Sequence, residues 1–162
     1  MWQVCREALG IEKIIAVEVD HCPQSYGCLL VLQDGGRLIY SGDTLPCQNF
    51  KNYALGCKLL IHEATFESGM DEDAKMKKHT TTGQALGLAK EVGAWRTILT
   101  HFSPRYSKVS EFSDLHFEVK ALSTFDHMRV SFKDLEWTYN VGHLYRKLLS
   151  NEDSKQKAAP TK

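Results

Sequence analysis

Residues 58–65 read KLLIHEAT, a short apolar run that passes directly into the polar side chains of His62 and Glu63. An apolar run of this length that follows a glycine is typical of a buried strand. Three further apolar runs end in the same way, in the sequences VEVDHC (residues 17–22), LIYSGD (38–43) and ILTHFS (98–103). Ligands of α/β proteins bind outside the strand ends, where loops converge, so these four junctions predict one shared site.

The rest of the chain alternates between strand and helix patterns. Strands are predicted at residues 14–19, 28–33, 37–40, 58–61, 95–100 and 128–132, and helices at residues 2–9, 49–55, 83–94, 112–122 and 140–150. Thr81 or Thr82 is expected to cap the third helix, and the charged segment 66–78 is expected to be flexible. The alternation indicates an α/β architecture. The tight turn Asp34-Gly35-Gly36 predicts a hairpin, which makes the sheet mixed and not purely parallel.

Length and composition are those of a single globular domain, which we place at residues 1–150, followed by a disordered polar tail at 151–162. Lysine plus arginine equals aspartate plus glutamate at 20 each, so the bulk charge gives no support for nucleic-acid binding. Five cysteines without a CxxC pair favour a reducing compartment over a disulfide framework. We expect no membrane-spanning helix, because no apolar stretch approaches about 18 residues. We also expect no secretory signal or arginine-rich presequence at the start.

The polar residues at the strand junctions have the chemistry of a metal or acid–base site. They are His21, Asp43, His62, Glu63 and His101. Histidine and carboxylate ligands suit zinc and other divalent ions, yet each residue alone also fits an ordinary hydrogen-bonded loop. From the residues alone, a metal-hydrolase fragment and a non-catalytic α/β domain therefore remain equally open. Three other histidines, His116, His127 and His143, have no such placement, and we expect them to be structural.

Five motifs, taken together and in order, carry a resemblance to a known family. The motifs VDHCPQSYG, SGDTLPC, LIHEATFE, KKHTTTGQA and HFSPRY resemble ribonuclease Z, the tRNA 3′-endonuclease of the metallo-β-lactamase superfamily. The similarity is greatest to the C-terminal region of the long eukaryotic form. It implies an αββα sandwich of which this chain supplies only the C-terminal half, a mixed sheet with flanking helices. It also implies part of a zinc-dependent endoribonuclease that removes the 3′ trailer of precursor tRNA and leaves a 3′-hydroxyl.

The resemblance assigns a role to each matching residue. His21, Asp43 and His101 correspond to metal ligands, and the aspartate bridges two zinc ions in the complete enzyme. Glu63 and His79 correspond to a pair that gives a proton to the leaving group. A sixth residue, Arg105, belongs to a segment expected to contact an RNA phosphate.

The main metal motif of the superfamily, His-x-His-x-Asp-His, is absent from this chain, in which no two histidines stand two apart. Three ligands are too few for a binuclear site, so we expect the isolated chain to be inactive. The expected partners are precursor tRNA and either an N-terminal half or a second copy of the chain. Two alternatives stay open: a non-catalytic interaction module, and another nuclease or phosphodiesterase of the same fold. An intracellular location, in the nucleus, the mitochondrion or both, is expected by resemblance.

Overall fold

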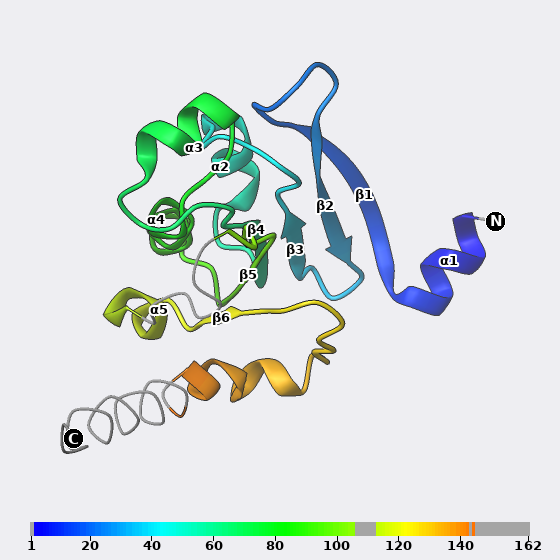
Figure 1. Ribbon diagram of the computed structural model, residues 1–162. Coiled ribbons are helices and arrows are strands. Elements are labelled where there is room, and N and C mark those ends of the chain that lie inside the picture. Colours follow the sequence, from blue (N-terminus) through cyan, green and yellow to red (C-terminus); the bar gives the residue numbers. More distant parts are fainter. Residues whose placement is uncertain (1, 106–112, 143, 145–162) are drawn as a thin grey trace, which may run out of the picture.

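The computed structural model describes residues 2–105, 113–142 and 144 (Figure 1). The predicted tail at 151–162 and most of the helix predicted at 140–150 lie outside these residues. The proposed domain boundary at residue 150 lies outside them as well. None of the described helices is long and apolar enough to cross a membrane.

Six strands form one sheet in sequence order, with helices between them. The elements are α1 (Trp2–Leu9), β1 (Ile11–Glu18), β2 (Tyr26–Leu32), β3 (Arg37–Tyr40), α2 (Gln48–Ala54), β4 (Leu59–Glu63), α3 (Asp71–Lys77), α4 (Thr82–Val92), β5 (Arg96–Thr100), α5 (Asp114–Glu118), β6 (Ala121–Ser123) and the 3-10 turns η1 (Asp134–Glu136) and η2 (Thr138–Asn140). β1 to β3 pair antiparallel, and β3 to β6 pair parallel. The sheet is therefore mixed, and the predicted α/β class is confirmed.

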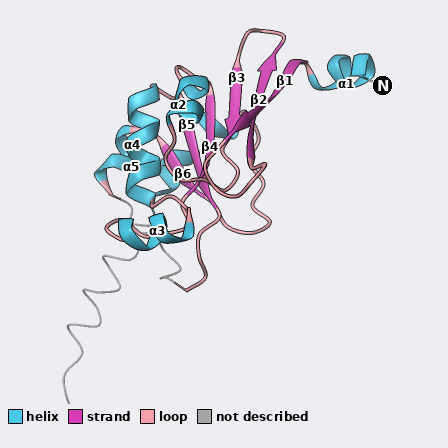
Figure 2. Cartoon of the chain, turned by 90° about the horizontal axis from the view of Figure 1, so that it is seen from above, coloured by secondary structure: helices cyan, strands magenta, loops and turns pink. Residues whose placement is uncertain are grey.

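Helices α2, α4 and α5 lie on one side of the sheet (Figure 2). The strand residues that point toward them form the core, with Leu29, Ile39, Leu60 and Leu99 all at most 4% exposed. Alternate residues along a strand point to opposite faces. The neighbouring positions therefore belong to the other side of the sheet.

That other face is apolar and only partly covered. A row of paired residues runs across it through Cys28, Tyr40, Ile61, Ile98 and Leu122. Tyr40 is 44% exposed, and Ile14 at the far edge of the same face is 48% exposed. A sheet buried on one side only normally presents polar residues on the other. We call this row, together with Ile14, the open face of the sheet; its exposed part lies over β1 to β3, whereas Leu122 in β6 is only 4% exposed.

The charged segment after β4 corrects one prediction. We expected residues 66–78 to be flexible, but they include helix α3. Acidic residues fill its first turn and lysines its last, which complements the helix dipole. Ala74 is fully buried, and Lys78 ends the helix in the left-handed conformation with φ of +57°. Helix formation therefore fixes the position of His79, the next residue.

The C-terminal third corrects two more predictions. The helix predicted at 112–122 covers only Asp114–Glu118, because Lys120 takes a left-handed φ of +50° and Ala121–Ser123 pair with β5 as β6. The strand predicted at 128–132 does not form. Its alternating pattern reflects Met128 and Val130, which line a cleft beside β6 without any strand partner. In the first case the parallel pairing to β5 outweighs the local helix pattern.

A buried histidine makes the stability of the fold dependent on pH. His116 is 1% exposed, and burial lowers its pKa from 6.5 to about 4. The unfolded chain gains a proton at this residue below pH 6.5, whereas the folded chain does not until about pH 4. This contribution to the free energy of unfolding is therefore complete above pH 6.5. It falls by about 3 kcal/mol as the pH drops to 4.

Urea denaturation at a series of pH values measures this loss. We expect the variant H116Q to lose stability less steeply between pH 6.5 and 4 than the natural chain. Some acid sensitivity should remain, because burial also lowers the pKa of His62. An unchanged slope in H116Q would contradict the assignment to His116.

Candidate metal and proton-transfer site

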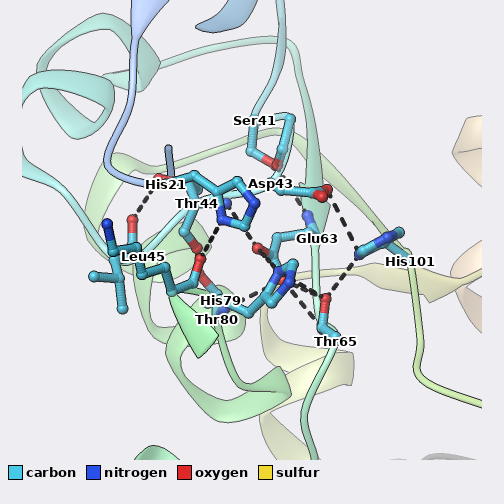
Figure 3. A network of polar contacts seen from close by, with 12 residues as sticks. His21, Ser41, Asp43, Thr44, Leu45, Glu63, Thr65, His79, Thr80 and His101 are labelled. Carbon is cyan, nitrogen blue, oxygen red and sulfur yellow. Dashed lines mark hydrogen bonds and ion pairs between the residues drawn. The ribbon is translucent and has the colours of Figure 1, made fainter. Parts of the chain in front are cut away.

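The site forms where five segments converge at one end of the parallel strands (Figure 3). Ser41 to Thr44 follow β3, Glu63 and Thr65 stand at the end of β4, and His101 follows β5. His79 and Thr80 come from the turn between α3 and α4, and His21 follows β1. The convergence predicted from the strand junctions is confirmed for His21, Asp43, Glu63 and His101.

Glu63 is the buried centre of this arrangement. It is 1% exposed, and both of its carboxylate oxygens accept hydrogen bonds. Oε1 accepts from the backbone N–H of Thr44 at 2.7 Å, and Oε2 accepts from the N–H groups of Thr80 at 3.2 Å and Thr65 at 3.3 Å. The Thr65 hydroxyl adds a bond of 2.6 Å to Oε2. Every one of these partners is a donor, which suits an ionised carboxylate that can only accept.

The loop after β3 holds this carboxylate in place. Ser41 is fully buried, and its hydroxyl accepts the backbone N–H of Glu63 at 3.0 Å and donates to the Gly42 carbonyl at 2.6 Å. Gly42 has φ of +61°, and a Cβ there would lie 3.0 Å from the Tyr26 carbonyl oxygen. Glycine is therefore required in this turn, which delivers Asp43 to the surface and the Thr44 N–H to Glu63.

His79 and Glu63 form the predicted pair. His79 Nδ1 donates to Glu63 Oε1 at 2.8 Å, across 16 residues of sequence. The imidazole is mostly buried but retains partial exposure, with 16% of the side chain accessible. A histidine held by a buried carboxylate through one nitrogen can deliver a proton from the other. The geometry therefore supports proton transfer by the outward-facing Nε2 of His79.

His21 lies against His79, with ring centroids 4.9 Å apart. Its Nδ1 lies 2.8 Å from the carbonyl oxygen of Lys78. A carbonyl can only accept, so Nδ1 carries the hydrogen and Nε2 keeps its lone pair. A histidine fixed in this way by a carbonyl is the usual form of a metal ligand.

His101 and Asp43 face each other across the mouth of the site. His101 Nδ1 lies 3.6 Å from Asp43 Oδ1 and 2.8 Å from the Thr65 hydroxyl oxygen. Both side chains are partly exposed. His101 has a left-handed φ of +61°, a conformation that is uncommon for residues other than glycine and is found at functional sites.

Among the described residues, two groups of side chains bring possible ligand atoms within 4.8 Å of one another. One is His21, Asp43 and His79; the other is Glu63, His79 and His101. Imidazole nitrogens and carboxylate oxygens are the donor set that zinc takes. The residues present therefore fit a metal, although the three predicted ligands are divided between the groups and His79 belongs to both.

Two of the candidate residues, His62 and Arg105, are placed differently from the others. His62 points into the core, where its Nδ1 donates to the Glu63 carbonyl at 2.7 Å and its ring packs on Phe50. Arg105 is exposed, and its backbone N–H donates to Ser103 Oγ at 3.4 Å. Residues 106–112, which follow Arg105, lie outside the described part of the chain.

Four hydroxyl residues of the site were not singled out from the sequence. They are Ser41, Thr44, Thr65 and Thr80. All four stand within the motifs SGDT, HEAT and KHTT, beside the residues that were named. Thr80 links two of these motifs by donating its hydroxyl to the Thr44 carbonyl at 2.6 Å. The signal that the sequence offered for these four residues was their position next to the residues that were named.

The fold defines the class of protein. The metallo-β-lactamase-fold protein YhfI from Bacillus subtilis matches with a TM-score of 0.56 and 23% identity, over 68% of this chain and 45% of that one. This structural match shows that the chain has part of a metallo-β-lactamase fold. No family model matches the sequence.

Sequence similarity narrows this class to one family. Zinc phosphodiesterase ELAC protein 2 of Rattus norvegicus is 41% identical over 79% of this chain, and the mitochondrial tRNAse Z TRZ4 of Arabidopsis thaliana is 34% identical over 89%. The long form RNase Z from yeast matches in structure with a TM-score of 0.74 and 31% identity, over 91% of this chain and 20% of that one. The chain is related to the ribonuclease Z family and spans 15% of the rat protein and 16% of the plant one.

Proposed function

We propose that this chain is the C-terminal part of a zinc-dependent endoribonuclease that removes the 3′ trailer from precursor tRNA. One observation carries the proposal: a buried glutamate and a histidine form a hydrogen-bonded pair directly beside potential metal ligands. The relatives named tRNAse Z and zinc phosphodiesterase support the substrate and the metal. The whole activity is a property of a longer protein, of which this chain supplies a segment.

In the proposed reaction the residues of this chain have two tasks. His21, Asp43 and His101 would hold zinc in the complete enzyme. When bound, zinc polarises the phosphodiester and activates water for attack. His79, in its doubly protonated form with Nδ1–H bonded to Glu63, gives its Nε2 proton to the ribose 3′-oxygen as the P–O3′ bond breaks, so His79 is left neutral and the product carries a 3′-hydroxyl. Arg105 contacts a phosphate of the RNA.

The partner that completes the enzyme is proposed to cover the open face of the sheet. YhfI is about twice as long as the matched region, and in our proposal the segment without a counterpart here packs on that face. This segment would bring the His-x-His-x-Asp-His ligands to the site. Pairing with a second copy of the chain would cover the face without supplying them.

Complementation tests the proposed function. We expect this chain alone, supplied with zinc, to give no site-specific cleavage of a precursor tRNA. Addition of a separately made N-terminal segment of a long-form relative, containing His-x-His-x-Asp-His, should restore cleavage that leaves a 3′-hydroxyl. Leu30 pairs with Ile14 on the open face, so L30D, a change away from the site, should block restoration. Efficient cleavage by the chain alone would contradict the expectation of inactivity.

An interaction module is the second candidate, supported by the exposed apolar row on the sheet. It predicts binding of the N-terminal segment without cleavage under any metal condition. A different phosphodiesterase of this fold predicts cleavage of small diesters but not of the tRNA trailer. The plant relative's name supports action in the mitochondrion, and nuclear action is proposed from the family resemblance alone.

A further inference from the structure

The side chain of Thr65 lies between the proton-transfer pair and a proposed metal ligand (Figure 3). Its hydroxyl oxygen is 2.6 Å from Glu63 Oε2, 2.8 Å from His101 Nδ1 and 3.4 Å from His79 Nδ1. Among the described residues, no other hydroxyl lies within hydrogen-bond distance of all three of these side chains. One hydroxyl group therefore connects the two halves of the site.

A hydroxyl has a single hydrogen, and its position follows from the neighbours. Glu63 offers only acceptor oxygens, and the 2.6 Å contact has the length of a charge-assisted O–H···O⁻ bond. Thr65 therefore donates to Glu63. Its oxygen is then an acceptor toward His101, so the hydrogen of the neutral His101 ring must be on Nδ1. The lone pair of that ring is left on Nε2.

We propose that Thr65 is a positioning residue that sets the tautomer and orientation of His101 and ties them to the charge on Glu63. That this tautomer presents Nε2 to zinc rests on the proposed function. The hydrogen bonds that join Glu63, Thr65 and His101 do not depend on it. His21 obtains the same tautomer from a backbone carbonyl. His101 obtains it from the side chain of Thr65.

The backbone around Thr65 keeps the hydroxyl in position. Its N–H donates to Glu63 Oε2 at 3.3 Å, and its carbonyl accepts the Ser103 N–H at 3.2 Å. The second bond joins the end of β4 to the loop that carries His101. Valine has nearly the same shape as threonine but no hydroxyl, so T65V removes the hydrogen bonds with little change in volume. Serine keeps the hydroxyl, which makes T65S the matched control.

Nitrogen-15 NMR of the histidine rings in this chain, at about pH 8.5 where imidazole is neutral, tests the proposal. We expect His101 to carry its hydrogen on Nδ1 in the natural chain and in T65S. In T65V the hydrogen should move toward Nε2, the form that free histidine favours. His21 should keep its hydrogen on Nδ1 in all three proteins, which provides an internal control. Zinc affinity, measured by competition with a chelator, should fall about 10- to 100-fold in T65V.

Three outcomes would overturn the proposal. They are an Nε2–H tautomer of His101 in the natural chain, an unchanged tautomer in T65V, and a loss of the Nδ1–H form in T65S. If T65V fails to fold, shown by loss of the His21 signal, the first and third measurements still decide. His101 could show the expected tautomer while this chain and the N-terminal segment together never cleave precursor tRNA. That result would contradict the proposed function and leave the role of Thr65 intact.

Discussion

The variant H79A is expected to cleave precursor tRNA about 100- to 10,000-fold more slowly than the natural sequence in the reconstituted enzyme, the range that a positioned proton donor contributes. The reason is the hydrogen bond of 2.8 Å from His79 Nδ1 to Glu63 Oε1: with Nδ1–H held by the carboxylate, the proton that a doubly protonated His79 gives up comes from Nε2. Without the proton from His79, the ribose 3′-oxygen must depart as an alkoxide. Single-turnover cleavage measures the loss directly at the chemical step.

Two further measurements separate proton donation from metal binding, since His79 belongs to both groups of potential ligands. Zinc content should be unchanged in H79A. A substrate with sulfur in place of the bridging 3′-oxygen needs no proton at the leaving group, so H79A should cleave it nearly as fast as the natural enzyme. H127A, a change at an exposed histidine outside both groups, should match the natural enzyme throughout. Loss of zinc in H79A would make His79 a ligand instead of the proton donor.

The sequence predicted the strands and helices up to residue 100 to within three residues at each end, helix α3 excepted. It succeeded there because apolar runs bounded by glycine and turn residues leave few alternatives. It also brought His21, Asp43, Glu63 and His101 together correctly, since the junctions that follow β1, β3, β4 and β5 lie at the same end of the sheet. The distance between Glu63 and His79 could not be predicted, because it depends on α3 and its left-handed end at Lys78.

After residue 100 the sequence was a poorer guide. Ala121–Ser123 form a strand of only three residues, too short to show a period, and its place is set by pairing with β5. The set of hydrogen bonds that threonines donate to Glu63, three from backbone N–H groups and one from a hydroxyl, also could not be predicted from the local pattern. Thr44, Thr65 and Thr80 come from three separate segments, and only the fold shows that each of them donates a hydrogen bond to one carboxylate.

Asp43 differs from the other site residues in how it is held. Glu63 is enclosed by donors, whereas the Asp43 carboxylate is 38% exposed and lies 3.6 Å from Nδ1 of His101. A carboxylate that is left partly free at the end of a rigid turn is available for metal, because few internal hydrogen bonds must be broken on binding. The turn is held by the buried Ser41 hydroxyl, which bonds to the Glu63 N–H and to the Gly42 carbonyl. The exposed position of Asp43 is therefore a reason to expect its main role in metal binding and not in folding.

The variant D43N is accordingly expected to abolish restored cleavage, with a loss of at least about a thousandfold, since metal catalysis supplies several kcal/mol. Zinc binding should fall in parallel, and the urea unfolding midpoint of the metal-free chain should be nearly unchanged. D20N removes the same charge beside His21, at an exposed residue outside both ligand groups, and should retain zinc and activity. D43N that keeps its zinc but loses cleavage would assign Asp43 to substrate or water. D43N that keeps both would remove it from the site, and the metal would then have to be held by His21, His79, His101 and the partner segment.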